Sequence, residues 1–330
     1  MKLIHAHDIS FAGLWSRLNL KDDFQLPFLS DLDIAYSAEY AIGSRFEDLS
    51  FLLEENGSPI LGLRLSACTR PDGTLELSGF GRALQYREAA DSTSNQRDGA
   101  TKLLRLEMQR LQTLFPSATV IYHDLRPALS PIGRLLLELG GQATPLFTQV
   151  IDLAAAEEQL RSRVQQSNKN RINWGVKNLS LNLCDHSNIA PEQMEQFRQL
   201  HIQAAGRETR SKRSWELQLD MIRANEAFLV LGSLEGQLVT GAFFMHSPKY
   251  CYYGVSASNR DLFEKPLGHA VLWTAILHSK KVGCNLFEVG EQLFPQQRNP
   301  PPTPKELNIS GFKKGFGGDT VVRLEIVLKK

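Results

Sequence analysis

Several features that mark common protein classes are scarce in this sequence. Its 330 residues include only four cysteines, Cys68, Cys184, Cys251 and Cys284. They form no CxxC pair, and no histidine cluster accompanies them. This spacing excludes a disulfide scaffold and the common zinc motifs. It predicts buried, reduced thiols, a reducing compartment and no bound metal.

Long apolar runs are also missing. A helix that spans a bilayer needs about 20 consecutive apolar residues, and no run approaches that length. The first residues, MKLIHAHDIS, lack the apolar core of a secretory signal. We therefore expect a cytoplasmic protein without a transmembrane segment.

The motifs of several large enzyme classes do not occur. There is no GxGxxG after a strand, no GxxxxGK[ST], no HExxH and no GxSxG, which argues against dinucleotide-binding enzymes, P-loop nucleotidases, zinc proteases and α/β-hydrolases. The net charge of +1 indicates no particular partner, and we expect no DNA binding. Residues 1–150 hold 14 Lys and Arg against 18 Asp and Glu, whereas residues 151–330 hold 23 against 18. The second half is therefore the better candidate for contact with anionic groups.

What the sequence does contain is a repeated order of glycines and turns. Residues 50–67, SFLLEENGSPILGLRLSA, and residues 227–246, AFLVLGSLEGQLVTGAFFMH, each place a glycine-containing turn between two apolar runs. This pattern is typical of a β-hairpin. The glycines repeat at an offset of 179: Gly57 and Gly62 in the first segment, Gly236 and Gly241 in the second.

Two further landmarks repeat in the same order. A run with helical periodicity follows Gly99 and another follows Gly268, and each leads into a strand-like run. A short helix that ends in a glycine pair then precedes a last strand. These pairs, at an offset of 177, are Gly140-Gly141 and Gly317-Gly318.

We interpret this order as two copies of one α/β unit, joined near Asp152. The predicted domains are residues 1–152 and residues 153–330, and the second is expected to carry the active site. The order of elements in each copy is hairpin, helix, strand, helix and strand. This order resembles that of the acyltransferase fold of the GNAT type. The predicted fold class is therefore α/β (α+β), with two tandem GNAT-like domains, each a mixed, mostly antiparallel sheet flanked by helices.

The stretch GFKKGFGG near the C-terminus places two lysines between two phenylalanines. If residues 305–316 form a helix, an apolar stripe runs along one face of it. The glycine pair is expected to end this helix. The stripe consists of Ile309, Phe312 and Phe316.

The two lysines differ in their distance from that stripe. Lys313 lies beside it and Lys314 nearly opposite. We expect Lys313 to be half-buried with its amine directed into a cleft, where an ammonium can stabilise a developing negative charge. A snorkelling lysine at the edge of a packed helix is the structural alternative. Lys314 is expected to be solvated or to meet a polyanion.

Residues 159–184 are basic and contain no acidic residue. With Trp174 nearby, they could bind the phosphates of a nucleotide sugar, a lipid diphosphate or a tRNA end. A solvated basic helix is the alternative. The basic residues are Arg161, Arg163, Lys169, Arg171 and Lys177.

A helix start and two strand ends supply further candidates. Gly268 and His269 open a helix, whose free amides form an anion site, although Gly268 could serve packing alone. Ligands gather at strand C-termini, where Tyr253 could hydrogen-bond a leaving group and Glu288 could receive a proton. The alternative is that Tyr253 and Glu288 are polar residues with only a structural role at the strand ends. The candidates for acceptor contact are Ser256, His201, Arg207 and Arg210.

The C-terminal half resembles the FemAB-like acyltransferases, a group with peptidoglycan bridge aminoacyltransferases and N-acyltransferases of bacterial surface sugars. Glu288 and Glu291 depart from the family pattern in the third of four matching segments. The segments are KNRINWGVK (169–177), YYGVSAS (252–258), GCNLFEVGE (283–291) and GFKKGFGG (311–318).

The resemblance implies transfer of an acyl or aminoacyl group to an amine, with Lys313 at the reacting carbonyl. It places acceptor or donor phosphates near Lys169 and Arg171, and a donor near Gly268, His269 and Lys314. The implied acceptor is an amino sugar on a nucleotide or lipid phosphate, or another precursor of a surface polysaccharide. Acyl-CoA is the favoured co-substrate, no cofactor is tightly bound, and aminoacyl-tRNA is the alternative donor. A second alternative is a non-catalytic binding protein with this fold.

Overall fold

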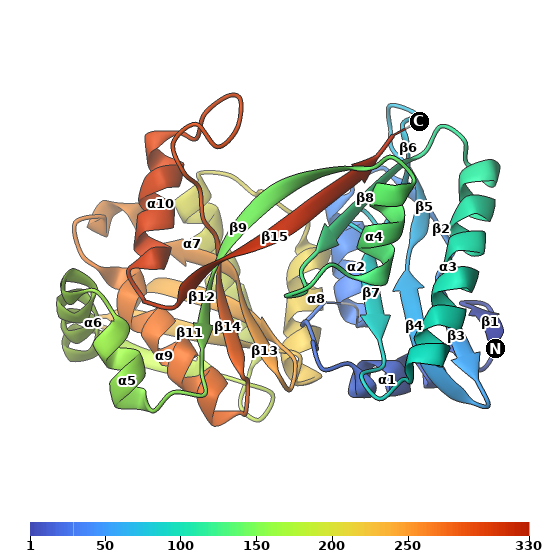
Figure 1. Ribbon diagram of the computed structural model, residues 1–330. Coiled ribbons are helices and arrows are strands. Elements are labelled where there is room, and N and C mark those ends of the chain that lie inside the picture. Colours follow the sequence, from blue (N-terminus) through green and yellow to red (C-terminus); the bar gives the residue numbers. More distant parts are fainter. Residues whose placement is uncertain (29, 330) are drawn as a thin grey trace. The chain divides into compact units, whose positions relative to one another are not determined.

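The computed structural model describes residues 1–28 and 30–329 (Figure 1). The chain forms two compact units. Unit 1 consists of Met1–Leu146 and Arg323–Lys330, and unit 2 of Phe147–Val322.

Both units contain helices and strands (Figure 1). In the first part of the chain they are β1 (Lys2–His5), α1 (Phe11–Lys21), α2 (Asp31–Tyr40), β2 (Arg45–Asp48), β3 (Phe51–Glu55), β4 (Ser58–Arg64), β5 (Ser66–Thr69), β6 (Leu75–Ser78), β7 (Gln85–Glu88), α3 (Ser94–Leu114), β8 (Thr119–Asp124), α4 (Pro131–Glu138) and β9 (Gln142–Asp152). In the second they are α5 (Glu157–Arg163), α6 (Gln166–Asn178), β10 (Ser180–Cys184), α7 (Pro191–Ala205), α8 (Lys212–Arg223), β11 (Ala227–Leu234), β12 (Gln237–His246), β13 (Tyr250–Ser258), a 3-10 turn (Arg260–Leu262), α9 (Leu267–Lys281), β14 (Leu286–Glu291), α10 (Pro304–Lys314) and β15 (Asp319–Leu328).

The strands pair mostly antiparallel, as predicted. In unit 1, β1-β3-β4-β7 form one antiparallel sheet, and β2-β5-β6-β8 form a second ladder with one parallel step between β6 and β8. In unit 2, β10-β11-β12-β13 are antiparallel neighbours and β14 adds parallel to β13. Helix α9 packs against β11 and β12, and α7 against β12 and β13. Unit 2 is thus a mixed sheet covered by helices, whereas unit 1 contains two ladders.

Both predicted hairpins form, and their turns are of the same kind. The turn between β3 and β4 has positive φ at Asn56 (51°) and Gly57 (77°). The turn between β11 and β12 has positive φ at Glu235 (51°) and Gly236 (84°). Two consecutive residues with positive φ define the type I′ turn that suits the twist of a two-residue hairpin. The repeated punctuation therefore reflects a repeated backbone conformation.

The second glycine of each hairpin leaves room for an aromatic ring. A Cβ atom on Gly62 would lie 2.8 Å from the Trp15 ring of α1, and one on Gly241 would lie 2.9 Å from the Phe197 ring of α7. Both glycines pair with a leucine of the preceding strand at the same place in the ladder. The packing of a helix on the hairpin is thus repeated as well.

The last strand of each sequence copy pairs with a strand of the other copy. Residues 148–152 of β9, which follows α4, pair with β14 in unit 2. Residues 324–328 of β15, which follows α10, pair with β8 in unit 1. The predicted boundary after Asp152 follows the repeat in the sequence, whereas the compact units follow these ladders. The exchange assigns residues 147–152 to unit 2 and 323–330 to unit 1.

Helix starts are less well predicted than hairpins. The prediction that a helix begins after Gly99 is wrong, because α3 begins at Ser94. Thr93 is its N-cap, and its hydroxyl and backbone exchange hydrogen bonds with Gln96 in a capping box. Gly268 also lies inside its helix, as the second residue of α9. In α3 the capping box upstream outweighs the low helix propensity of Gly99.

All four cysteines are free and buried, as predicted. Cys251 and Cys284 belong to the core of unit 2, together with aromatic side chains of three strands. Among the described residues, no helix is both long and apolar enough to cross a bilayer.

The close contact at Gly241 predicts a stability effect. Replacing Gly241 by Ala should lower the free energy of unfolding by about 1–3 kcal/mol, because the added methyl would displace the buried Phe197 ring. Urea unfolding measures this change. Gly311→Ala in α10 is the matched control, since nothing lies within 4 Å of its Cβ position. Equal stability of the two variants would contradict the packing argument.

Candidate active site

Two neighbouring strands of the unit 2 sheet, β13 and β14, are parallel and share only a short ladder. Residues Tyr250–Tyr252 of β13 pair with Leu286–Glu288 of β14. Beyond that point β13 continues along β12 to Ser258, and β14 continues along β9 to Glu291. Ligands of α/β sheets bind at the C-terminal ends of parallel strands. The two strand ends after Tyr252 and Glu288 are therefore the first place to look for a site.

Each of these strands has an irregularity just past the shared ladder. In β13 the register shifts at Gly254, which lies between residues paired with Phe243 and Phe244. In β14 the register shifts before Gly290, whose φ is 109°. Bulges change the direction of a strand and are common beside functional sites.

Lys313 lies above β14 at this irregularity. Its Nζ atom is 3.5 Å from the carbonyl oxygen of Glu291, and a Cβ atom on Gly290 would lie 2.9 Å from Nζ. Lys313 is half-buried, and burial lowers the pKa of its ammonium, while Glu291 and Glu288 partly oppose the shift. The structure thus places a partly desolvated cation at the end of β14, and its half-burial agrees with the prediction from the spacing.

The GFKKGFGG segment matches its prediction in part. Phe316 is only 1% exposed, Phe312 is half-buried against the unit 2 core, and Lys314 is exposed. The stripe does not extend to Ile309, which is 44% exposed. Ser310 is buried instead, because its hydroxyl accepts a hydrogen bond from the Leu293 backbone N–H.

The end of this helix also differs from the prediction. Helix α10 ends at Lys314, two residues before the predicted limit. The backbone N–H groups of Phe316 and Gly317 still bond to the carbonyls of Lys313 and Lys314. Gly317 and Gly318 then turn the chain with φ of 89° and 75°. A Cβ atom on Gly318 would lie 2.2 Å from the Val150 carbonyl oxygen. The glycine pair therefore permits the turn of the chain into β15. It does not mark the end of helix α10.

Glu288 is held by two hydroxyl donors. Its carboxylate accepts hydrogen bonds from Thr148 Oγ1 at 2.7 Å and from the Tyr250 hydroxyl at 2.6 Å. These contacts orient the carboxylate on a half-buried strand position. Its charge is near enough to act on the Lys313 ammonium. Glu288 and Lys313 are thus linked by this electrostatic effect, while the hydrogen bonds of the Glu288 carboxylate go to Thr148 and Tyr250.

Tyr253 belongs to a different environment. Its ring stacks on Phe244 at 5.3 Å and packs against the unit 2 core. Burial raises the pKa of its phenol, and a hydrogen bond with Ser256 opposes that shift. The phenol therefore stays protonated at neutral pH and can act only as a neutral donor.

His269 is buried rather than exposed at the start of α9. It is 9% exposed, with its ring nearly perpendicular to that of Phe312 (centroids 4.9 Å apart) and stacked with that of Phe316 (5.9 Å). Neither ring nitrogen makes a well-formed hydrogen bond among the described residues. Burial, with a smaller effect of Arg171, lowers the pKa of His269 to about 4, although the Pro266 carbonyl opposes the shift. The imidazole is therefore neutral.

The backbone at the start of α9 remains available. The N–H of Gly268 has no hydrogen-bond partner among the described residues. A Cβ atom on Gly268 would meet only Phe312 Cζ, at an ordinary contact distance of 4.0 Å. Packing therefore does not require a glycine here. The free amide lies at the N-terminal end of α9, and this end of a helix favours anions.

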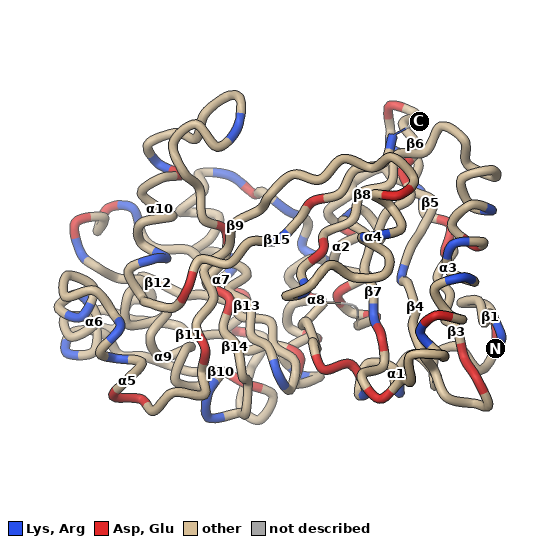
Figure 2. The backbone as a smooth tube through the Cα atoms, viewed as in Figure 1, with Lys and Arg blue, Asp and Glu red and all other residues tan. Residues whose placement is uncertain are grey.

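The basic segment is only partly free. Lys169 Nζ donates to the Ser162 carbonyl at 3.0 Å, and Arg161 lies over the Trp273 ring at 5.1 Å while donating to Asn173. Arg171 is exposed beside His269, and α6 carries no acidic residue (Figure 2). Arg171 is thus the exposed basic residue of this segment whose charge acts at the start of α9.

Arg207 is not brought to the other candidates. It is exposed in the connection between α7 and α8. Its neighbour along the chain, Arg210, lies over the Trp215 ring at 4.4 Å and bonds to His201 at 3.2 Å. Ser256 is exposed on β13. Among the described residues, no hydrogen bond or ion pair joins Arg207 or Ser256 to Lys313.

Asn168 is a site residue that the sequence analysis missed. It is buried, its amide donates to the Phe312 carbonyl at 3.4 Å, and a Cβ atom on Gly315 would lie 2.3 Å from this amide. The N–H of Gln165 donates to the Gly315 carbonyl at 3.0 Å. The start of α6 thus holds the last turn of α10, next to Lys313. The helical spacing of Asn168, Ile172 and Gly175 on the buried face of α6 was the available signal.

The buried imidazole predicts a pH dependence of stability. Because the pKa of His269 is about 4 in the folded protein and 6.5 ordinarily, its contribution is complete above pH 6.5 and is lost as the pH falls towards 4. The loss amounts to up to about 3 kcal/mol. Urea unfolding across this range should show a smaller decline for His269→Leu. His7→Gln, at an exposed position, is the control and should decline like the natural protein.

Comparison of the sequence with protein families and with curated proteins gives no match. Solved structures are similar over almost the whole chain. FemX has 13% sequence identity and a TM-score of 0.71, over 98% of this chain and 97% of that one. The C-terminal domain of a putative lysylphosphatidylglycerol synthetase from Agrobacterium fabrum has 12% identity and a TM-score of 0.62, over 96% and 91%.

A third similar structure bears directly on the duplication. A tandem GNAT protein from the clavulanic acid biosynthesis pathway has 15% identity and a TM-score of 0.54, over 99% of this chain and 98% of that one. Together with the repeated hairpins and helices, these similarities show that the chain has the tandem GNAT-like fold, shared with FemX.

Proposed function

We propose that the protein is an acyltransferase that forms an amide between an acyl group and an amine. The proposal depends above all on the half-buried Lys313 ammonium at the end of β14, where the short β13–β14 ladder ends. The similarity in fold to FemX and to a tandem GNAT protein supports this reaction class. We assign the active site to unit 2.

In the proposed reaction the acceptor amine attacks the carbonyl carbon of a thioester or aminoacyl ester. Lys313 stabilises the oxyanion of the tetrahedral intermediate, because a partly desolvated ammonium interacts strongly with a developing charge. Glu288 receives the proton that the amine loses. The bond to the sulfur or oxygen of the leaving group then breaks, the leaving group takes the electron pair, and the proton held by Glu288 is returned to it through solvent. Tyr253, with its raised phenol pKa, is a neutral hydrogen-bond donor for that group.

Acyl-CoA is the favoured donor. The unpaired Gly268 amide at the start of α9 offers a contact for phosphate, with Lys314 exposed on the neighbouring α10. His269 would act through packing beneath Phe312 and Phe316 rather than by direct contact. The alternative donor is aminoacyl-tRNA, because α9 follows a single glycine and not a glycine-rich loop.

The acceptor is proposed to be an amino sugar carried on a nucleotide or lipid phosphate, in a cytoplasmic step of surface polysaccharide synthesis. Arg171 and Lys169 would meet the phosphate, with Arg207 and Ser256 as further contacts. Fold similarity to a lysylphosphatidylglycerol synthetase is compatible with an acceptor on a lipid phosphate. No tightly bound cofactor and no metal are part of this proposal.

The two lysines give a direct test of the mechanism. Lys313→Ala should lower kcat by about 100-fold with little change in donor affinity, as for loss of an oxyanion donor. Lys314→Ala should weaken binding of the anionic donor and leave kcat nearly unchanged. Steady-state kinetics on both variants measures these effects. Near-normal turnover of Lys313→Ala would contradict the assigned role.

Donor choice can be measured before an acceptor is known. Acetyl-CoA and longer acyl-CoAs should raise the melting temperature by binding the folded state, and Lys314→Ala should reduce that rise. Aminoacyl-tRNA in the same assay tests the alternative donor. If none of these compounds shifts the melting temperature, a non-catalytic binding protein becomes the better description.

A further inference from the structure

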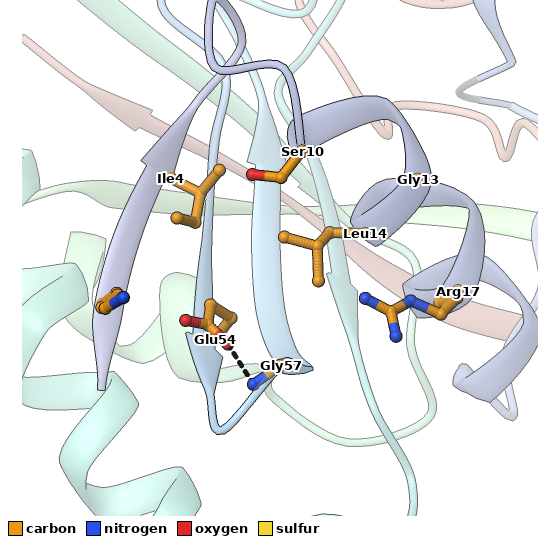
Figure 3. Close-up of a pocket in the computed structure, with 8 residues that line it drawn as sticks. Ile4, Ser10, Gly13, Leu14, Arg17, Glu54 and Gly57 are labelled. Atoms are coloured by element: carbon orange, nitrogen blue, oxygen red, sulfur yellow. Dashed lines mark hydrogen bonds between the residues drawn. The ribbon is translucent and has the colours of Figure 1, made fainter.

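A groove of about 490 Å³ lies in unit 1, between α1 and the strands β1 and β3 (Figure 3). Ile4 and Leu14 form its apolar part. We propose that this groove binds a small zwitterion with one ammonium and one carboxylate group, such as a free amino acid. Its polar lining consists of Lys2, Ser10, Arg17 and Glu54.

Glu54 supplies the negative side of the groove. It is 8% exposed, and its Oε2 atom accepts a hydrogen bond of 2.6 Å from the Gly57 N–H (Figure 3). Its other oxygen has no partner among the described residues. Lys2 is its neighbour in the ladder, yet the two form no ion pair. The unpaired oxygen is accessible from the groove, so a ligand ammonium would pair with it.

Arg17 supplies the positive side from α1. Its guanidinium is directed towards the groove, and it has no hydrogen bond or ion pair among the described residues (Figure 3). A guanidinium matches the geometry of a carboxylate. Since Glu54 and Arg17 face the same space, an amine or a carboxylate alone would leave one of them without a partner. A zwitterion pairs with both.

Gly13 is the unexpected member of the lining. It lies inside α1, where glycine is less favourable than alanine. Nothing lies within 4 Å of its Cβ position, so packing does not require a glycine. A side chain at this position would enter the groove, which Gly13 borders. The glycine therefore keeps the groove open.

The groove uses none of the residues proposed for acyl transfer. The site consists of unit 1 residues only, whereas Lys313 and Glu288 belong to unit 2. Occupancy can therefore be measured on the full chain without an activity assay, and its outcome is separate from that of the proposed reaction.

Isothermal titration calorimetry with L-leucine is the test, because the apolar part suits an aliphatic side chain. L-leucine should bind, and N-acetyl-L-leucine and L-leucinamide should each bind at least about tenfold more weakly, since each lacks one charge. Absence of leucine binding at millimolar concentration would overturn the proposal. Equal binding of N-acetyl-L-leucine would reduce the site to an anion site and overturn it too.

Variants identify the site of binding. Gly13→Leu should fill the groove and abolish binding, and Glu54→Gln should weaken it at least about tenfold. Glu47→Gln and Arg45→Ala, both at exposed positions of β2, are the matched controls and should bind normally. If Glu54→Gln disturbs the turn at Gly57, Gly13→Leu still decides. Undiminished binding by Gly13→Leu would contradict the proposal.

Discussion

The approach of the Lys313 ammonium to the backbone of β14 is the contact on which the candidate site depends. Gly290 has a φ of 109°, which favours glycine, and a Cβ atom at this position would lie 2.9 Å from the Lys313 Nζ atom. The position of Nζ in turn depends on the last turn of α10, which Asn168 holds through the Phe312 carbonyl. Gly315 leaves space for that amide. Two glycines and one buried amide thus determine where the charge lies.

The duplication reaches further than the order of elements. Turn conformation, ladder position and the aromatic ring beneath the second strand repeat between β3–β4 and β11–β12. The proposed catalytic lysine, Lys313 at the end of β14, belongs to the second copy. The last strand of each copy pairs with a strand of the other copy, β9 with β14 and β15 with β8. The two similar units are thus assigned different roles here, the proposed reaction in unit 2 and the proposed ligand groove in unit 1.

The basic segment illustrates why charge in a sequence overstates the charge that a ligand meets. Arg161 and Lys169 use hydrogen bonds and a ring contact within the protein to join α5 to α6 and α9. Arg171 and Lys177 are exposed. Net charge of a segment is a property of composition, whereas the hydrogen bonds that it can offer a ligand depend on which cations already donate within the protein.

The sequence alone determined the hairpins, the buried thiols and the half-buried Lys313, because turn dihedrals and helical periodicity depend on residues close along the chain. The tertiary structure decided the strand exchange, the burial of His269 under Phe312 and the exposure of Ile309. It also decided the role of Asn168, whose partner Phe312 is 144 residues away. Such contacts have no local signature, since they depend on which surfaces meet once the sheet has formed.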